Sequence, residues 1–472
     1  MRKIAEGNKT RFVMIEMFED TIIAISSPLG CGGLGIVRLS GDKALSIAKK
    51  IFKPKRKMWR KIAPQTLILG DVYDFKRKEF VDEAYLAYFA APRSYTRENM
   101  VEISCHGSPV ILEEVVRLGI KAGARHAHPG EFTLRAYLRG RIDILQAEAV
   151  NDLIMATSLQ QAKISFGQLQ GRLSQRIDSL RCQVIHLLSQ VEASIEFPEE
   201  RLRLSPRQIA KSLEFVILTI KKLIASYERG KTLTEGLTLA IAGKANVGKS
   251  TLFNALLDED RAIVSPYPGT TRDYLRERIK IKDSLFQLID MAGLERSSHP
   301  VEKEGIKRGE ELASRADGIL LLLDSSRPES QADLNLIRKF KDKKTILLFN
   351  KSDLPQKMNK AKCRGLNNDK CWLEISALKG TNLDRLREMI HGTFVPTENA
   401  AEEVILHLRQ KLMLEQSLDA LNQALSLLQQ GHSEEVFAEE IRRALPFLGQ
   451  LTGEIKVDEV IESIFRRFCV GK

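Results

Sequence analysis

One segment of the sequence has the residue types and the spacing that bind the phosphates of a nucleotide. Residues Gly243–Ser250 fit the pattern G-x-x-x-x-G-K-[ST]. In such a loop the backbone N–H groups surround the phosphates, Lys249 reaches the β and γ oxygens, and the hydroxyl of Ser250 binds Mg²⁺. Apolar residues 237–242 predict a buried strand before the loop. Residues 252–257 predict a helix after it, whose positive end favours an anion.

Further segments that suit a nucleotide follow in order along the chain. Pro268–Asp273 is polar, and a hydroxyl there can join Mg²⁺. Asp290 ends a predicted strand and can hold a water of the metal, and Gly293 can sense the γ-phosphate. The carboxylate of Asn350–Asp353 can accept two N–H groups that guanine has and adenine lacks, and Ser376–Leu378 can support the base. This order predicts a guanine-nucleotide site and resembles the motifs of the translation-factor-related GTPases.

The position that orients the attacking water in many small GTPases is unusual here. Leu294 stands where those proteins have a glutamine, and its side chain forms no hydrogen bonds. Another group must therefore act on the water, and the nearby acids are Glu295, Glu302 and Glu304.

Length and charge limit the wider organisation. The 472 residues suggest about three domains of roughly 150 residues each. The net charge of +12 is uneven, because residues 1–140 contain 24 Lys and Arg against 15 Asp and Glu. This asymmetry fits an anionic partner such as nucleic acid, or only a basic surface. The basic run Lys53–Lys61, with Trp59, leaves the same two readings open: contact with phosphates or a solvated loop.

Other composition features argue against several classes of protein. The six cysteines contain no C-x-x-C pair, so neither a disulfide framework nor a zinc site is expected. The apolar runs are too short for a membrane span, and no secretory signal is visible at the start. Cys469 stands four residues from the end, but Gly471 and Lys472 do not suit a prenylation box. We expect a cytoplasmic protein without membrane association.

The hydrophobic pattern divides the chain into elements that would position these residues. Residues 1–19 form an N-terminal extension, and 20–139 alternate strand and helix as one α+β domain. Its predicted strands are 21–26, 35–39, 67–73, 83–89 and 101–105, and its predicted helices are 44–51 and 109–121.

The rest of the chain alternates between long helices and a sheet domain. Residues 140–235 carry an apolar helical stripe from Leu169 to Ile195 and a second helix at 205–227. Residues 236–394 predict a doubly wound, mostly parallel sheet. Its strands are expected at 237–242, 278–281, 285–290, 318–324, 345–350 and 372–376. Residues 395–472 restart a stripe at Ile405. We predict a discontinuous helical bundle with an inserted Ras-like P-loop GTPase domain.

Four further stretches resemble the MnmE (TrmE) family, the GTPases of tRNA wobble-uridine modification. They are Pro28–Arg38, Ser94–Ser108, Pro129–Asp143 and the terminal Phe468–Lys472. The resemblance runs from about Asp20 to the end of the chain. It implies that residues 20–139 form a folate-binding-like domain for tetrahydrofolate binding and dimerisation, and that 395–472 end in a cysteine motif.

The resemblance implies a folate site in the N-terminal domain. Arg38, Glu102, Arg141 and Lys472 match its folate-binding positions, and the ligand would be 5-formyl-tetrahydrofolate or a related folate. Arg can pair with a folate carboxylate, and Glu can accept N–H bonds from a pterin. The alternative for the first three is an internal ion-pair set. Arg141 replaces the Lys expected there. Cys469 is implied to lie near the modification chemistry as a catalytic residue.

The resemblance also implies the ions of the nucleotide site. The potassium ligands would be Asn246, Ser265, Tyr267 and Thr270, the Mg²⁺ ligands Ser250 and Thr271, and the catalytic acid Glu302. Met291 replaces the usual Thr, which supplies no evident catalytic group. The full GTP-binding set is Asn246, Val247, Gly248, Lys249, Ser250, Thr251, Ser265, Thr270, Thr271, Asp290, Gly293, Asn350, Lys351, Asp353, Ser376 and Ala377.

The function implied by the resemblance is a K⁺-activated GTPase. As a homodimer in a heterotetramer with an FAD-dependent MnmG (GidA)-type partner, it would modify carbon 5 of the tRNA wobble uridine. The group added would be aminomethyl or carboxymethylaminomethyl, with a folate one-carbon unit. Two alternatives remain: a GTPase for ribosome assembly, which would need an RNA-binding module, and a stand-alone folate-dependent methyltransferase in which GTP is only regulatory.

Overall fold

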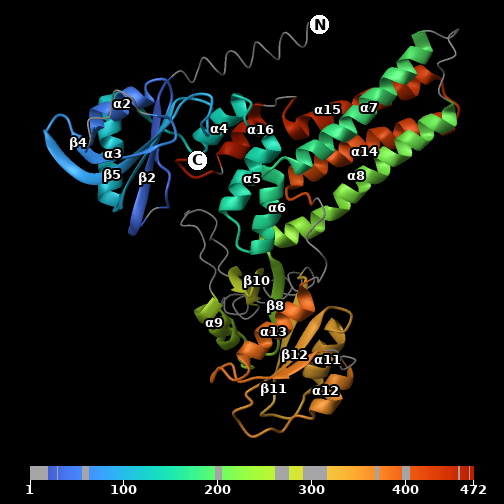
Figure 1. Cartoon of the computed structure of the whole chain (residues 1–472). Coiled ribbons are helices and arrows are strands. Elements are labelled where there is room, and N and C mark those ends of the chain that lie inside the picture. Colours follow the sequence, from blue (N-terminus) through green and yellow to red (C-terminus); the bar gives the residue numbers. More distant parts are fainter. Residues whose placement is uncertain are drawn as a thin grey trace, which may run out of the picture. The chain divides into compact units, whose positions relative to one another are not determined.

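The computed structural model describes most of the chain as two compact units. The described residues are 20–28, 30–55, 63–196, 205–260, 276–290, 316–366, 371–395, 404–454, 458–466 and 468–472. The first unit contains Met1–Asn151, Gly167–Ile220 and Leu412–Lys472, and the second contains Asp152–Phe166 and Lys221–Lys411. Figure 1 shows the elements of both.

The first unit contains a seven-stranded sheet in the order β3-β4-β5-β6-β2-β1-β7. Its strands are β1 (Ile22–Ile25), β2 (Gly32–Ser40), β3 (Phe52–Pro54), β4 (Leu67–Asp74), β5 (Glu79–Phe89), β6 (Met100–Gly107) and β7 (Arg125–His126). Neighbouring strands are antiparallel except β1 and β7. The strand predicted at 83–89 begins earlier, because Glu79, Phe80 and Asp82 also pair with β4.

Two helices pack against this sheet (Figure 1). Helices α2 (Ala44–Ile51) and α3 (Pro109–Ala122) confirm the predicted positions. In α2 the buried residues are Ala44, Ile47, Ala48 and Ile51, the spacing that places side chains on one helical face. This face and the inward side chains of β2, β4, β5 and β6 form one apolar core.

The first unit also contains several further helices. They are α4 (Glu131–Leu138), α5 (Ile144–Ile154), α6 (Leu159–Leu169), α7 (Arg172–Glu196), α8 (Pro206–Glu235), α14 (Leu408–Gln429), α15 (Glu434–Thr452) and α16 (Asp458–Phe465), of which α5, α6, α8 and α14 extend across the unit boundaries. Side-chain pairs join α7 to α15 and to Glu454 just after it, including Glu192 with Arg442 at 2.5 Å and Arg181 with Glu454 at 2.5 Å. Within the described part of the chain, no helix is long and apolar enough to span a bilayer.

Three predicted helix boundaries are wrong. The helix expected at 205–227 continues to Glu235 in α8. The stripe expected to run from Leu169 is split, since Leu169 ends α6 and Gly171, with φ +84°, separates it from α7. A left-handed glycine ends a helix at little steric cost. The stripe expected from Ile405 belongs to a helix only from Leu408, because Val404–His407 have no regular secondary structure.

The second unit contains a six-stranded sheet in the order β13-β12-β11-β8-β10-β9. The strands are β8 (Leu237–Ala242), β9 (Arg276–Ile281), β10 (Ser284–Asp290), β11 (Gly318–Asp324), β12 (Thr345–Asn350) and β13 (Trp372–Glu374). All neighbours are parallel except β9 and β10, which confirms the predicted, mostly parallel sheet. β13 ends two residues earlier than expected.

Helices cover both faces of this sheet. β8 alternates between the faces: Leu239 and Ile241 join one core, and Ala240 and Ala242 join the other. Helices α9 (Lys249–Asp260) and α13 (Leu383–Phe394) contribute to the first core, and α11 (Gln331–Phe340) and α12 (Lys360–Leu366) contribute to the second. The doubly wound arrangement is therefore confirmed, and ligands of such sheets bind at the carboxyl ends of the strands.

The two segments that connect to this sheet domain bind each other. We call Ser226–Gly230 of α8 and Val404–Lys411 the neck. The Ile405 N–H donates to Ser226 Oγ at 3.2 Å, and the Lys411 ammonium lies 5.0 Å from the centre of the Tyr227 ring. A Cβ on Gly230 would collide with the backbone carbonyl of Ile405. Glycine therefore allows the two backbones to approach this closely.

Candidate functional site

The phosphate-binding segment forms the connection between β8 and α9. Gly243 and Gly248 have φ angles of +149° and +100°, and Asn246 has +63°. A Cβ on Gly243 would lie 2.5 Å from the Leu322 carbonyl oxygen, and one on Gly248 would collide with the Asn350 side chain. Both glycines are thus required by the backbone conformation and by close neighbours. The loop leads directly into the N-terminus of α9, where backbone N–H groups favour an anion.

Lys249 places a buried cation inside this loop. Its side chain is 4% exposed, and Nζ donates to the carbonyl oxygens of Gly243 at 2.7 Å and Lys244 at 3.1 Å. The neighbouring Ser250 is the second residue of α9 and lines the same cavity as Lys249. A fixed cation beside a helix N-terminus is the chemistry that phosphate oxygens require.

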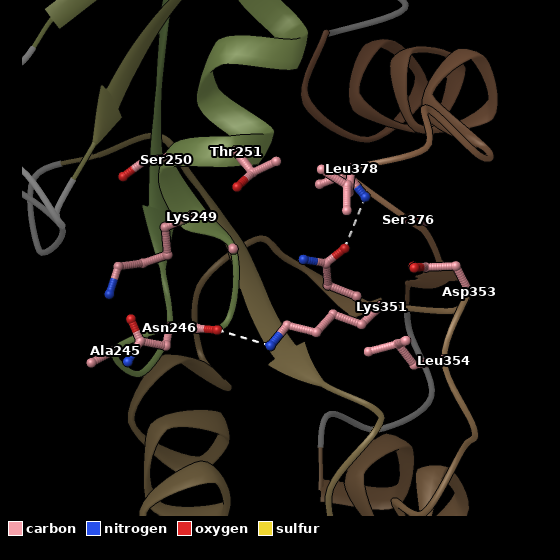
Figure 2. A pocket seen from close by; sticks show the side chains of 13 residues that line it. Ala245, Asn246, Lys249, Ser250, Thr251, Lys351, Asp353, Leu354, Ser376 and Leu378 are labelled. Carbon is pink, nitrogen blue, oxygen red and sulfur yellow. Dashed lines mark hydrogen bonds between the residues drawn. The ribbon is translucent and has the colours of Figure 1, made fainter.

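The loops after β12 and β13 form the opposite wall (Figure 2). The Asn350 side chain joins both walls, since its Nδ2 donates to the Val247 carbonyl at 2.7 Å and its Oδ1 accepts from the Ala377 N–H at 2.9 Å. A side-chain hydrogen bond from Ser376 lowers the pKa of Asp353. Asp353 therefore stays ionised near neutral pH and can accept the two N–H groups of a guanine.

Lys351 crosses from the base side of the cavity to the phosphate loop. Figure 2 shows it reaching Asn246, whose carbonyl oxygen accepts from Nζ at 3.0 Å. Nζ also contacts Asp324 Oδ2 at 2.6 Å. Burial would raise the pKa of Asp324, but hydrogen bonds from Lys351 and Ser326 outweigh it and lower the pKa. Asp324 was not among the predicted site residues, although a lone acid at the end of an apolar strand is a signal in the sequence.

These segments enclose one cavity of about 580 Å³. Its lining residues are Ala245, Asn246, Gly248, Lys249, Ser250, Thr251, Asn350, Lys351, Asp353, Leu354, Ser376, Ala377 and Leu378. The structure thus brings together most of the described residues that were predicted to bind GTP. Ala245, Leu354 and Leu378 were not on that list, although Ala245 and Leu378 lie within the predicted motifs and Leu354 follows Asp353.

The other residues predicted to bind GTP or its metal ions either do not line the cavity or fall outside the described residues. Val247 does not line the cavity but accepts the Asn350 bond. Asp290 ends β10 in register with Ile241, which puts it at the same sheet edge as the phosphate loop. The remaining residues lie outside the described parts of the chain: Ser265, Tyr267, Thr270, Thr271, Gly293 and Glu302.

A second group of predicted residues gathers in the first unit. Arg38 of β2 and Glu102 of β6 are in register, and Arg38 Nη2 lies 2.7 Å from Glu102 Oε1. The Arg38 guanidinium also lies 5.4 Å from the Tyr95 ring centre and 5.6 Å from that of Phe132. Arg38 and Glu102 therefore form the internal ion pair that was the alternative to a ligand site.

Arg141 and Glu102 nevertheless line a cavity of about 590 Å³. The Arg141 guanidinium lies 4.7 Å from the Tyr95 ring centre, and Nη1 donates to the Tyr95 carbonyl at 3.0 Å. The other lining residues are Gln65, Phe89, Pro92, Arg93, Ser94, Tyr95, Arg97 and Met100. Several guanidinium groups around an aromatic ring can hold a flat ligand that carries carboxylates.

The C-terminus is folded against this region. Gly471, with φ +93°, has its carbonyl bound by Ser26 Oγ at 2.9 Å and by Arg38 Nη1 at 3.5 Å. Burial and the nearby Arg38 charge lower the pKa of Lys472. The Cys469 carbonyl accepts from the Gly130 N–H at 3.3 Å, and the Cys469 side chain is half-buried. Arg38, Glu102 and Lys472 are thus neighbours, as a common site requires.

The doubly wound sheet, the phosphate loop and the cavity at its edge define a P-loop nucleotide-binding protein. The family model described as the MnmE helical domain matches residues 144–469, and that described as the GTP-binding protein TrmE N-terminus matches 21–141. The chain belongs to the MnmE family. Its relatives include the tRNA modification GTPases MnmE of Thermoanaerobacter sp. (strain X514), Syntrophus aciditrophicus and Aquifex aeolicus, which are 40%, 39% and 40% identical.

The alignments with these relatives span almost the whole chain. They cover 97% of this chain for the first two and 96% for the third, and 100% of each relative. Among solved structures, the G domain of the T. maritima FeoB iron transporter is 30% identical, covers 33% of this chain and 98% of its own, and has a TM-score of 0.24.

Proposed function

We propose that this protein hydrolyses GTP and that the hydrolysis serves tRNA modification. One observation supports the first half most directly: the phosphate loop, Asn350–Asp353 and Ser376–Leu378 line a single cavity of about 580 Å³. Asp353 is the residue we assign to guanine, because an ionised carboxylate accepts the paired N–H groups of that base. The names of the full-length relatives support the second half.

The proposal assigns metal ions to the phosphate side of the cavity. Ser250 and Thr271 would hold Mg²⁺, which neutralises charge between the β and γ oxygens. Asn246, Ser265, Tyr267 and Thr270 would hold K⁺, which offsets negative charge that develops on the phosphates. The Ser250 position fits, because it lines the cavity at the start of α9. Glu302 would orient the attacking water.

The proposal assigns a reduced folate, such as 5-formyl-tetrahydrofolate, to the cavity beside Arg141. The donor set fits such a molecule: Glu102 can accept N–H bonds from a pterin, while Arg141 and Arg38 can pair with carboxylates. Lys472 would add a donor beside Arg38. The folate would supply a one-carbon unit, and Cys469 would act in the modification chemistry.

At the level of the assembly, we propose a cytoplasmic homodimer that pairs through residues 20–139. Together with an FAD-dependent MnmG-type partner it would add an aminomethyl or carboxymethylaminomethyl group to carbon 5 of the tRNA wobble uridine. Residues 236–394 would be the GTPase domain, and 140–235 with 395–472 would form the helical domain that carries it.

Two measurements test these halves separately. Purified full-length protein should release phosphate from GTP with Mg²⁺ and K⁺ and should leave ATP intact. Mass analysis of tRNA from a strain lacking the gene should show unmodified wobble uridines, and the wild-type gene should restore them. Protein without GTP hydrolysis, or a deletion strain with fully modified anticodons, would refute the corresponding half.

A further inference from the structure

Asp324 is a charged side chain at the nucleotide cavity that none of the motifs accounts for. It is the last residue of β11, is 9% exposed, and lies in register with Asn350, the last residue of β12. The preceding residues of β11, Gly318–Leu323, are all buried. A carboxylate is costly to bury unless its oxygens are paired, so its partners indicate what it does.

The partners of Asp324 lead to the phosphate loop. Oδ1 accepts from the N–H and the hydroxyl of Ser326, at 3.0 and 2.6 Å. Oδ2 accepts from Lys351 Nζ at 2.6 Å, and Nζ also donates to the Asn246 carbonyl at 3.0 Å. One ammonium group therefore links the end of β11 to the backbone of the phosphate loop. We call this the Asp324–Lys351–Asn246 bridge.

Two residues of this bridge, Lys351 and Asn246, have a backbone conformation that needs support. Lys351 and Asn246 each have φ +63°, in the left-handed region that residues with a Cβ adopt at a cost. A lysine side chain also has many rotamers, and fixing it costs entropy. A carboxylate that fixes the ammonium before the nucleotide arrives removes that cost from the binding step.

We propose that Asp324 is a positioning residue for the guanine nucleotide. It holds the Lys351 ammonium against the Asn246 carbonyl, so that the phosphate loop and the base-recognising segment are aligned before binding. This inference rests on the proposed function of the cavity as a GTP site. Asp324 acts through Lys351, and it therefore affects GTP and GDP equally and leaves the choice of base to Asp353.

The experiment uses full-length protein and a fluorescently labelled GDP. Asp324→Asn keeps the shape of the side chain but removes its charge. We expect labelled GDP and GTP to dissociate roughly tenfold to a hundredfold faster, the range for losing a hydrogen bond to a charged group. The change should fall on KM rather than on kcat, and the preference for GTP over ATP should be kept. Asp317→Asn is the matched control, because Asp317 flanks the other end of β11 and accepts the Thr238 N–H at 2.8 Å.

A double-mutant cycle tests whether Asp324 acts through Lys351. Lys351→Met should also speed dissociation, and adding Asp324→Asn to it should change little further, because the shared interaction is already lost. The double variant can still be measured if Asp324→Asn alone does not fold, because it removes the Lys351 charge together with that of Asp324. Wild-type dissociation from Asp324→Asn, or effects that add fully, would overturn the inference. Failure of the wild-type protein to bind labelled GDP would instead overturn the proposed function.

Discussion

The two cavities described above have similar volumes, about 580 and 590 Å³, and basic side chains line both. They are built in different ways. In the nucleotide cavity, Lys249, Asn350 and Lys351 bind main-chain carbonyls of one loop. In the cavity beside Arg141, Glu102 binds the Arg38 side chain, and Arg141 lies against the Tyr95 ring; the main-chain bond of Arg141 goes to the Tyr95 carbonyl, outside any phosphate-type loop.

This difference bears on how each cavity recognises a ligand. A loop whose carbonyls are fixed by side chains presents its N–H groups in one geometry, which suits the phosphates common to all nucleotides. Its base specificity must therefore come from a few side chains. A site built on side chains distributes specificity over many groups. Substitution of the base-recognising side chain should therefore change specificity in the first cavity, whereas substitutions in the second should change affinity or stability.

The strongest test is Asp353→Asn. The variant cannot accept the two guanine N–H groups, so GTP affinity should fall by roughly a hundredfold or more. A xanthine nucleotide should gain affinity, because its added carbonyl can accept from the new amide. Titration with labelled GTP and XTP measures both. Asp384→Asn changes a fully exposed carboxylate and is the control. Unchanged GTP affinity would exclude Asp353 from base recognition.

Glu302→Ala separates binding from hydrolysis in the same cavity. If the backbone-built site holds the phosphates and Glu302 orients the water, GTP affinity should stay and hydrolysis should fall by roughly a hundredfold or more. Phosphate release and equilibrium GTP binding are the two measurements, with Glu304→Ala alongside for comparison. Equal turnover by Glu302→Ala would remove Glu302 from its assigned role.

Exchange of K⁺ for Na⁺ at constant ionic strength tests whether a cation completes the phosphate side. Hydrolysis should slow by about tenfold, since less of the developing negative charge is offset. The rate of phosphate release in the two salts measures this, with Mg²⁺ held constant. Indifference to the exchange would contradict a potassium site at Asn246.

Glu102→Gln tests the side-chain-built cavity. Arg38 loses the partner of a mostly buried pair, which should lower the free energy of unfolding by about 1–3 kcal/mol. Wobble-uridine modification should fall in a complemented deletion strain, while GTP hydrolysis in vitro stays near the wild-type rate. Glu83→Gln is the control, because Glu83 is exposed and pairs with Lys55. A large loss of GTP hydrolysis would mean that the two cavities are not independent.

The smallest effect is expected from Lys244→Met. Lys244 Nζ ties the phosphate loop to the start of α11, at 2.8 Å from Ser330 Oγ and 3.3 Å from Asp333 Oδ2, but its side chain is 40% exposed. Exposed pairs contribute about 1 kcal/mol or less, so labelled GDP should dissociate only a few times faster. A dissociation rate more than tenfold faster would show that this partly exposed ion pair stabilises the loop as strongly as a buried pair does.

Much of the fold could be predicted from the sequence, because its signals are local. The 44–51 helix is read from four apolar positions at helical spacing, and β8 from one apolar run. The errors arose where one residue overrides the pattern. Gly171 splits an otherwise continuous stripe. Ile405 continues a helical pattern but lies before the helix, where its N–H donates to Ser226.

The nucleotide cavity was also predictable, since each of its motifs is contiguous in sequence. Asp324 was not, because its role depends on the register that places it beside Asn350. The pair of Arg38 with Glu102 joins residues 64 positions apart and depends on strand pairing in the same way. Such residues become visible by sequence only through resemblance to a family.

The neck has a mechanical consequence for the nucleotide domain. The polypeptide enters and leaves that domain through the two segments of the neck, which the hydrogen bond from the Ile405 N–H to Ser226 and the close approach of Gly230 to the Ile405 carbonyl hold together. If these two connecting segments did not contact each other, each could move independently of the other. We therefore expect the two segments to move together, so that a displacement of the nucleotide domain would reach α8 and α14 at the same time. A side chain at position 230 would collide with the Ile405 carbonyl and force the two segments apart.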